Sequence, residues 1–180
     1  NGQAMRMIVD RFEALGYKWA YRELDARSFG VAQRRKRIFF LATKIERFEP
    51  RRVLFPDVGN KTPVVDDKHL PIPQKYAHAF GFYWTEGERA LGWTVNSVPT
   101  IKVGSTLGIP SPPAIWNVHN KDELGSLIGT PHIEDLEALQ GFPRGWTKEA
   151  SKPRQRWKLI GNAVCSKMSE WIGKRIIMEM

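Results

Sequence analysis

The sequence has a single cysteine among its 180 residues, and no apolar run in it approaches the length of a membrane span. One cysteine excludes a disulfide within the chain, and a membrane helix needs roughly 20 consecutive apolar residues. The start of the chain also lacks the basic segment, apolar stretch and small-residue cleavage site of a secretory signal. These absences predict a protein of a reducing, intracellular compartment with no role in a membrane.

Acidic residues are also few relative to basic ones. The chain has 28 Lys and Arg against 19 Asp and Glu, a formal net charge of +9. Because neutralising phosphates releases condensed counterions, this excess favours a polyanion, and nucleic acid above all, as the partner. The alternative is a charge that serves only solubility. The length suits one substantial core, or a core with a small added lobe, but not several independent domains.

Hydrophobic periodicity in the first 45 residues predicts a helix, a strand, a loop and a second strand. Apolar residues recur at helical spacing, and Gly16 follows where a left-handed residue ends many helices. These residues are Met5, Ile8, Val9, Phe12 and Leu15. Residues 17–24 then alternate aromatic and polar side chains, which is typical of a strand. Residues 38–42 are continuously apolar, which predicts a strand covered on both faces.

The regular pattern disappears between about residues 51 and 130, where Pro, Gly and isolated aromatic residues accumulate. This composition predicts a separate, irregular lobe with few regular elements. Periodicity returns near Ile133 with a short helix that Gly141 ends, and a longer helix with an apolar stripe follows from Val164 onward. Since the chain starts at Asn1 rather than Met, we expect it to be a segment of a longer protein.

The strongest polar feature is a row of four cations at residues 34–37, directly before the apolar strand. With the period of two of an extended segment, Gln33, Arg35 and Arg37 share one face. Their donor groups then converge at the end of a core strand, where they suit an anionic backbone or a carbonyl on a base edge. A solvated basic turn is the alternative, but the apolar strand that follows favours a binding site.

Two further features lie near the C-terminus. Residues 139–143, Leu-Gln-Gly-Phe-Pro, end a helix, and on their own they indicate a structural stop packed by Phe142. Residues 155–164 are interpreted as the start of the last helix, with Gly161 allowing a polar ligand to approach free backbone N–H groups. Simple capping of that helix by Asn162 is the alternative.

In their order and spacing, these three features resemble the C-terminal motifs of the DNA cytosine-5 methyltransferase family. Residues 29–37 resemble the eighth motif, residues 139–143 the ninth and residues 155–164 the tenth. The resemblance covers residues 1–45 and 131–180, and the lobe between them takes the place of the family's variable target-recognition domain.

The resemblance implies an α/β fold: the C-terminal part of an S-adenosylmethionine-dependent methyltransferase sheet, which is Rossmann-like, plus a small irregular target-recognition lobe. Residues 1–50 are then the C-terminal part of the catalytic domain, residues 51–130 the target-recognition domain, and residues 131–180 the return to the catalytic domain with its closing helices. A sheet without its parallel half would favour self-association or partner binding.

The family transfers a methyl group from S-adenosylmethionine to carbon 5 of a cytosine flipped out of duplex DNA. A cysteine thiolate adds to carbon 6, a glutamate assists at N3, and an arginine of the eighth motif donates to the cytosine O2. By position Arg37 is the candidate for that arginine. Arg35, a second candidate in the catalytic site, and Gln33 would position the site or contact the DNA backbone.

The resemblance also implies residues for the cofactor and for DNA. Asn162, Ala163 and Val164 match residues that help to close the S-adenosylmethionine pocket. Thr100 and Ile101 resemble the Thr-aliphatic dipeptide of family recognition lobes and are expected to contact DNA; residues 106–107 resemble it less closely. No metal site is implied.

Several family features are missing from this sequence. It has no Gly-rich cofactor loop, no Pro-Cys nucleophile and no Glu-Asn-Val segment, all of which precede the eighth motif in the family. Cys165 lacks the preceding Pro and is interpreted as a small buried residue inside the last helix. Glu134 and Asp135 stand where an Arg-Glu pair is usual, which leaves the structural ion pair there without its usual partners.

We therefore expect the chain to be inactive alone. Its expected partners are double-stranded DNA and the missing N-terminal catalytic half, which is either part of the same polypeptide or a separate chain. In the second arrangement this chain is the non-catalytic DNA-binding subunit of a split methyltransferase. The resemblance also implies a bacterial or phage-like protein of the cytoplasm, associated with the nucleoid.

Overall fold

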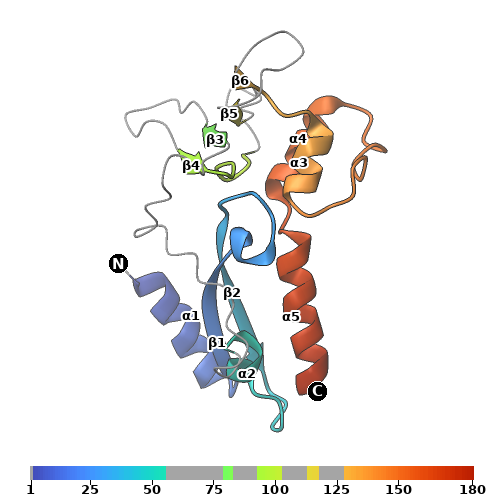
Figure 1. The fold of residues 1–180 in the computed structure, drawn as a ribbon. Helices are drawn as coiled ribbons and strands as arrows, with labels where there is room; N and C mark the ends of the chain where they lie inside the picture. Colours follow the sequence, from blue (N-terminus) through green and yellow to red (C-terminus); the bar gives the residue numbers. More distant parts are fainter. Residues whose placement is uncertain (1, 56–78, 83–92, 103–112, 118–127) are drawn as a thin grey trace.

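The N-terminal part of the chain folds into a helix, a two-stranded hairpin and a second short helix (Figure 1). The computed structural model describes residues 2–55, 79–82, 93–102, 113–117 and 128–180. Its first elements are α1 (Gln3–Ala14), β1 (Lys18–Asp25), the 3-10 helix η1 (Ala26–Phe29), β2 (Lys36–Thr43) and α2 (Pro50–Leu54). The predicted order of helix, strand, loop and strand is confirmed.

The hairpin is antiparallel along its whole length, from the pair Lys18 and Thr43 to the pair Asp25 and Lys36. The prediction that β2 is covered on both faces is wrong for the described residues, because its central residues are only half-buried and Ile38 is 56% exposed. Phe39 packs against the cluster that contains Met168 of α5, and the Phe40 ring lies 5.1 Å from that of Phe12 on α1, so each face of β2 is covered only in part.

The middle of the chain contains more regular structure than the sequence predicts. The strands β3 (Ala79–Phe82), β4 (Thr94–Val95), β5 (Ala114–Asn117) and β6 (Ile128–Gly129) form a sheet in the order β4-β3-β5-β6. All its pairings are antiparallel. The strands are too short to show a period, which is why the lobe was expected to be irregular. A parallel bridge between Gln33 and Val98 joins the lobe to the segment before β2.

The C-terminal part consists of α3 (Ile133–Leu139), α4 (Pro153–Asn162) and α5 (Ser166–Glu179). The short helix and its end are confirmed, since Gly141 has a φ of +83°. The single long last helix is wrong: Asn162 closes α4, so it does not cap a helix start, and the extended Ala163 separates the two helices. Cys165 is buried as expected, but it is the N-cap of α5 and lies before the helix.

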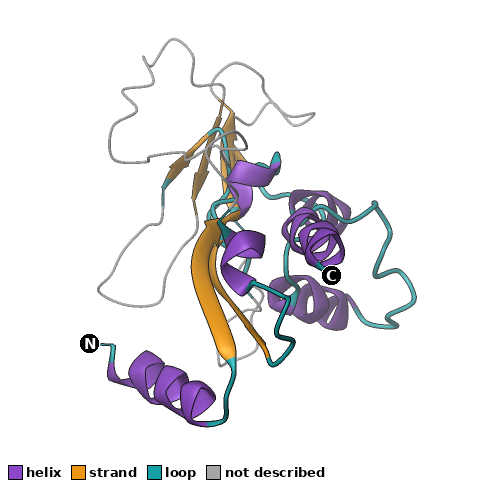
Figure 2. Ribbon diagram, turned by 90° about the horizontal axis from the view of Figure 1, so that it is seen from below, coloured by secondary structure: helices purple, strands orange, loops and turns teal. Residues whose placement is uncertain are grey.

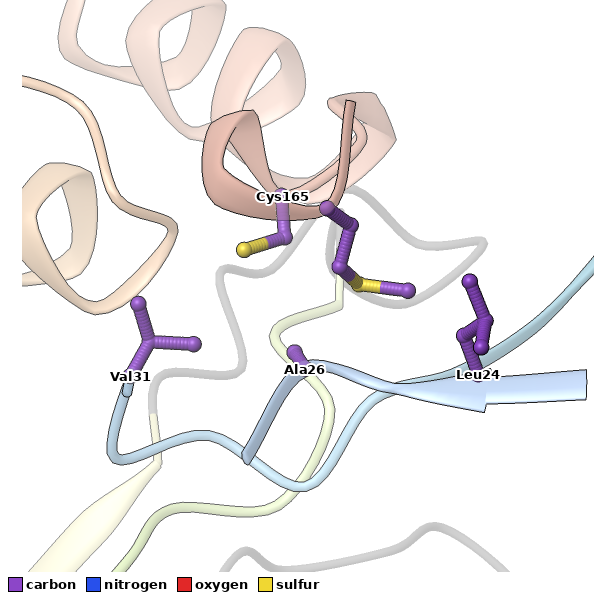
Figure 3. Close-up of a cluster of buried hydrophobic side chains, with 5 residues drawn as sticks. Leu24, Ala26, Val31 and Cys165 are labelled. Carbon is purple, nitrogen blue, oxygen red and sulfur yellow. The ribbon is translucent and has the colours of Figure 1, made fainter. Parts of the chain in front are cut away.

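Two apolar clusters hold these elements together. One joins the hairpin region to α5, and Figure 3 shows Leu24, Ala26 and Val31 facing Cys165 from the other side of the cluster. The other joins the lobe that carries β3 to β6 to the C-terminal helices through Ile101, which packs with residues of α3 and α4. The described residues include no helix of the length and apolarity that crossing a membrane requires.

The helix α2 belongs to the same body as the hairpin and α5. Its Val53 and Leu54 are buried, and the Arg175 guanidinium of α5 donates to the carbonyl oxygens of Arg52 and Val53. Because α2 begins at Pro50, it spans the predicted boundary between the first and second domains. The domain boundaries stay a prediction.

Candidate DNA and cofactor site

A buried pair of glutamines connects the segment that resembles the eighth motif to the one that resembles the ninth. The Gln33 side-chain amide donates to the Gln140 side-chain oxygen at 2.8 Å and to the Leu139 carbonyl at 3.0 Å. Gln140 in turn donates to the Ile160 carbonyl at 2.8 Å. Both glutamines are fully buried. Since buried amides are costly unless bonded, this chain of hydrogen bonds fixes the three segments relative to one another.

Arg35 makes a second connection from the same segment. Its guanidinium donates to the carbonyl oxygens of Ala163 at 2.7 Å, Gly161 at 3.0 Å and Ile101 at 3.3 Å. Two of these acceptors lie at the end of α4 and one in the lobe that carries β3 to β6. Gln33 repeats the link to the lobe by accepting from the Ile101 N–H at 3.3 Å. The eighth-motif segment is therefore the junction between the lobe and the C-terminal helices.

The positive charge of Arg35 is buried and lies near a second cation. Burial, and then repulsion from Arg37, lower the pKa of Arg35 to about 10, so it stays protonated at neutral pH. Its Nε is the one buried side-chain nitrogen or oxygen atom without a hydrogen-bond partner in the described part of the chain. Arg35 therefore has a structural role, in which its guanidinium holds the segments of the site together.

The other predicted site residues divide into anchors and exposed groups. Thr100 donates its hydroxyl to the Arg34 carbonyl at 2.8 Å, and Ile101 beside it is buried. Arg37, at the start of β2, is exposed and donates to the Lys36 carbonyl. Asn162 and Val164 are exposed on either side of Ala163. The structure thus brings Gln33, Arg35, Thr100, Ile101 and Ala163 together, and it leaves the side chains of Arg37, Asn162 and Val164 exposed at the surface.

The less closely matching pair at residues 106–107 lies outside the described residues.

A buried carboxylate that the sequence did not reveal holds the loop after α3. Glu137 accepts hydrogen bonds from the backbone N–H groups of Gly145, Trp146 and Thr147, from the Thr147 hydroxyl and from Arg156. Burial would raise the pKa of Glu137, but the bonds from Thr147 and then Arg156 and Gly145 lower it to about 2. Glu137 is ionised at neutral pH and fixes the loop to α3 and α4.

Two ion pairs lie in this region. Asp135 pairs with Arg144 at 2.5 Å near the surface, and Glu137 pairs with Arg156 at 3.0 Å in the interior. In the sequence, the sign that Glu137 is buried is its position directly beside the apolar Leu136. Its partners could not be found in the same way, because they lie 8 to 19 residues away along an irregular loop. No helical or strand period relates those positions.

The fold of the chain is similar to that of a solved methyltransferase. It matches the crystal structure of the S. pombe Dnmt2 methyltransferase with a TM-score of 0.59, over 97% of this chain and 60% of that one. The sequence identity of 15% makes this a likeness of fold alone. The mixed α/β fold that the resemblance implied is confirmed.

The family described as C-5 cytosine-specific DNA methylase matches residues 1–90, half of the chain. The chain belongs to this family. It is 42% identical over 188 residues to the Type II methyltransferase M2.BsuMI of Bacillus subtilis (strain 168). It is 25% identical over 182 residues to the Type II methyltransferase M.NaeI of Lentzea aerocolonigenes.

The chain is shorter than these relatives. The match covers 98% of this chain but 44% of M2.BsuMI, and 94% of this chain but 43% of M.NaeI. The chain therefore spans less than half the length of each of these two relatives.

Proposed function

We propose that this chain supplies target recognition and part of the catalytic site of a DNA cytosine-5 methyltransferase that uses S-adenosylmethionine. The observation that carries the proposal is the junction built by Gln33 and Arg35. Three segments that resemble family motifs, far apart in the sequence, meet there through buried hydrogen bonds. A basic surface loop unrelated to these enzymes would not be expected to join three segments through buried hydrogen bonds.

Arg37 is the residue that we assign to the cytosine O2. It follows the buried Arg35 by two positions, and its guanidinium is exposed to a flipped base, with a hydrogen bond to the neighbouring Lys36 carbonyl. A cation there stabilises the negative charge that develops on O2 as a nucleophile adds to carbon 6. Arg35 and Gln33 act as positioning residues in this scheme, because both are buried and bonded to other parts of the chain.

The segment from Asn162 to Val164 fits one wall of a cofactor pocket. Arg35 and Gln140 both hold the Ala163 carbonyl, so the segment has a fixed course, while the amide of Asn162 and the apolar side chain of Val164 face outward. S-adenosylmethionine, when bound, supplies the methyl group. The remaining walls and the cysteine nucleophile are expected from residues outside these 180, on the same polypeptide or on a partner chain.

Thr100 and Ile101 are proposed to anchor the recognition lobe. Both contact the eighth-motif segment, through the Thr100 hydroxyl and through the backbone N–H and carbonyl of Ile101. Movement of the lobe on duplex DNA would therefore reach Arg35 directly. Base reading belongs to other residues of the lobe, since Ile101 is buried.

The test is the substitution Arg37→Ala in the protein that contains this chain. Removing a donor to a developing oxyanion lowers kcat by about 10²- to 10³-fold, and KM for S-adenosylmethionine should change little. Methyl transfer to duplex DNA measures both. Lys36→Ala is the matched control, because Lys36 is the neighbouring exposed cation and pairs only with exposed Glu23 at 3.2 Å. Equal losses in the two variants would contradict the assignment.

A further inference from the structure

More than half of the net charge of the chain lies in fifteen consecutive residues. Residues 144–158, named here the basic segment, carry six cations and one anion, a net charge of +5 out of the +9 of the whole chain. The cations are Arg144, Lys148, Lys152, Arg154, Arg156 and Lys158, and the anion is Glu149. Because these cations repel one another, their concentration in one segment favours binding of a partner of opposite charge.

The basic segment is held in a defined shape. Its first half is the loop after α3, whose backbone N–H groups at 145–147 are bonded to the buried Glu137 carboxylate. Its second half is the start of α4, which Arg156 ties to the same carboxylate and to the Thr147 hydroxyl. Figures 1 and 2 show this loop extending away from the rest of the described chain.

Most of the cations do not serve the fold. Arg156 binds Glu137 and Arg144 binds Asp135, but the other four are exposed and form no ion pair with any residue that the structure describes: Lys148, Lys152, Arg154 and Lys158. Lys152 is the N-cap of α4, and the first turn of the helix holds no acidic residue. Cations at the positive end of a helix dipole are unfavourable, so their placement favours an external anion.

The basic segment also exposes an aromatic side chain. Trp146 is 61% exposed and stacks on Phe142, with 5.7 Å between the ring centroids. Its backbone N–H is bonded to Glu137 at 3.1 Å, so the ring is presented from a fixed point. Cations interleaved with a fixed aromatic ring suit the charged backbone and sugars of a nucleic acid.

We propose that the basic segment is a second DNA-contacting surface, which binds the phosphate backbone of the duplex and reads no sequence. The inference rests on the proposed function for the choice of duplex DNA as partner. It is separate from the eighth-motif site, because it uses none of the residues assigned to the base or the cofactor. A loop held by Glu137 loses little conformational freedom on binding, which favours affinity.

The test compares two double variants of the protein that contains this chain. Lys148→Ala with Lys158→Ala removes two cations of the basic segment, whereas Arg6→Ala with Arg51→Ala removes two exposed cations elsewhere. Binding to mixed-sequence duplex DNA is measured by fluorescence anisotropy over a range of salt concentrations. Each lost phosphate contact lowers the slope of log K against log salt by about 0.9 in magnitude, so the first variant should lose about 2 and the control none.

Equal slopes for the parent and the two variants would overturn the inference, and so would a parent that does not bind DNA. A loss seen on duplex RNA but not on duplex DNA would overturn the choice of partner. The proposed function is judged separately by methyl transfer: a parent that binds DNA with the expected slopes but methylates nothing would contradict that function alone.

Discussion

At the scale of single residues, the most constrained charge is the Glu137 carboxylate. It is fully buried, and all its bonds go to the loop after α3 and to Arg156 of α4. Removing one partner of a buried ion pair costs about 3 to 5 kcal/mol, because the other charge is left uncompensated. Arg156 is partly exposed, with 18% of its side chain accessible, so water relieves part of that cost.

We predict that Glu137→Gln lowers the free energy of unfolding by about 3 kcal/mol at neutral pH. Denaturant unfolding measures it. Glu134→Gln, on the exposed side of the same helix, should change stability by no more than about 0.5 kcal/mol. The pKa of Glu137 lies near 2, below its ordinary 4.5, so its contribution is complete above pH 4.5 and fades as the pH falls toward 2. A difference between parent and Glu137→Gln that does not shrink over that range would refute the assigned ionisation.

A site residue could be predicted from the sequence only where it belongs to a recognisable motif. Gln33 and Arg35 could be picked out because they precede an apolar strand in a regular spacing. Their acceptors could not, since Ile101 and Gly161 lie 66 and 126 residues from Arg35 in the sequence. The face shared by Gln33, Arg35 and Arg37 also divides in the structure, because the first two turn inward and the third is exposed.

At the scale of elements, the turn after α3 is fixed by Gly141. Its φ of +83° is one that side-chain-bearing residues avoid. A Cβ on Gly141 would also lie 2.7 Å from the Ser166 hydroxyl, which itself donates to the Gly141 carbonyl. The turn therefore holds the end of α3 against the start of α5.

We predict that Gly141→Ala lowers the free energy of unfolding by about 1 to 3 kcal/mol, whereas Gly173→Ala raises it by about 0.5 to 1 kcal/mol. Gly173 lies inside α5, and a Cβ there meets nothing within 4 Å. Thermal unfolding of the two variants checks the pair. A stabilising Gly141→Ala would mean that the turn differs from the one described.

Segments with a clear apolar period could be predicted from the sequence, and segments without one could not. α1, β1 and α3 lie where their periods indicate, because each has enough apolar residues to define a face. The break between α4 and α5 was missed because Val164 continues the helical spacing, while the backbone extends at Ala163 to present carbonyls to Arg35. The strands of the second sheet span two to four residues each, too few to show a period.

At the scale of the whole molecule, the described chain leaves much apolar surface open. Large apolar side chains are exposed on α1, on β2 and at the end of α5: Met7, Ile8, Leu15, Ile38, Ile177 and Met178. Apolar surface of this extent indicates contact with further protein. The catalytic half that the family relationship calls for is the occupant we propose for the faces of α1 and β2.

We propose that the chain contributes to cytosine-5 methylation but needs a cysteine nucleophile from outside residues 1–180, and one measurement decides this. Duplex DNA is incubated with S-adenosylmethionine and the protein, then digested to nucleosides for mass spectrometry. We expect 5-methylcytosine when residues 1–180 are joined to or mixed with the catalytic half, and none with residues 1–180 alone. Methylation by residues 1–180 alone, a methyl group on an exocyclic amine, or no methylation in either combination would contradict it.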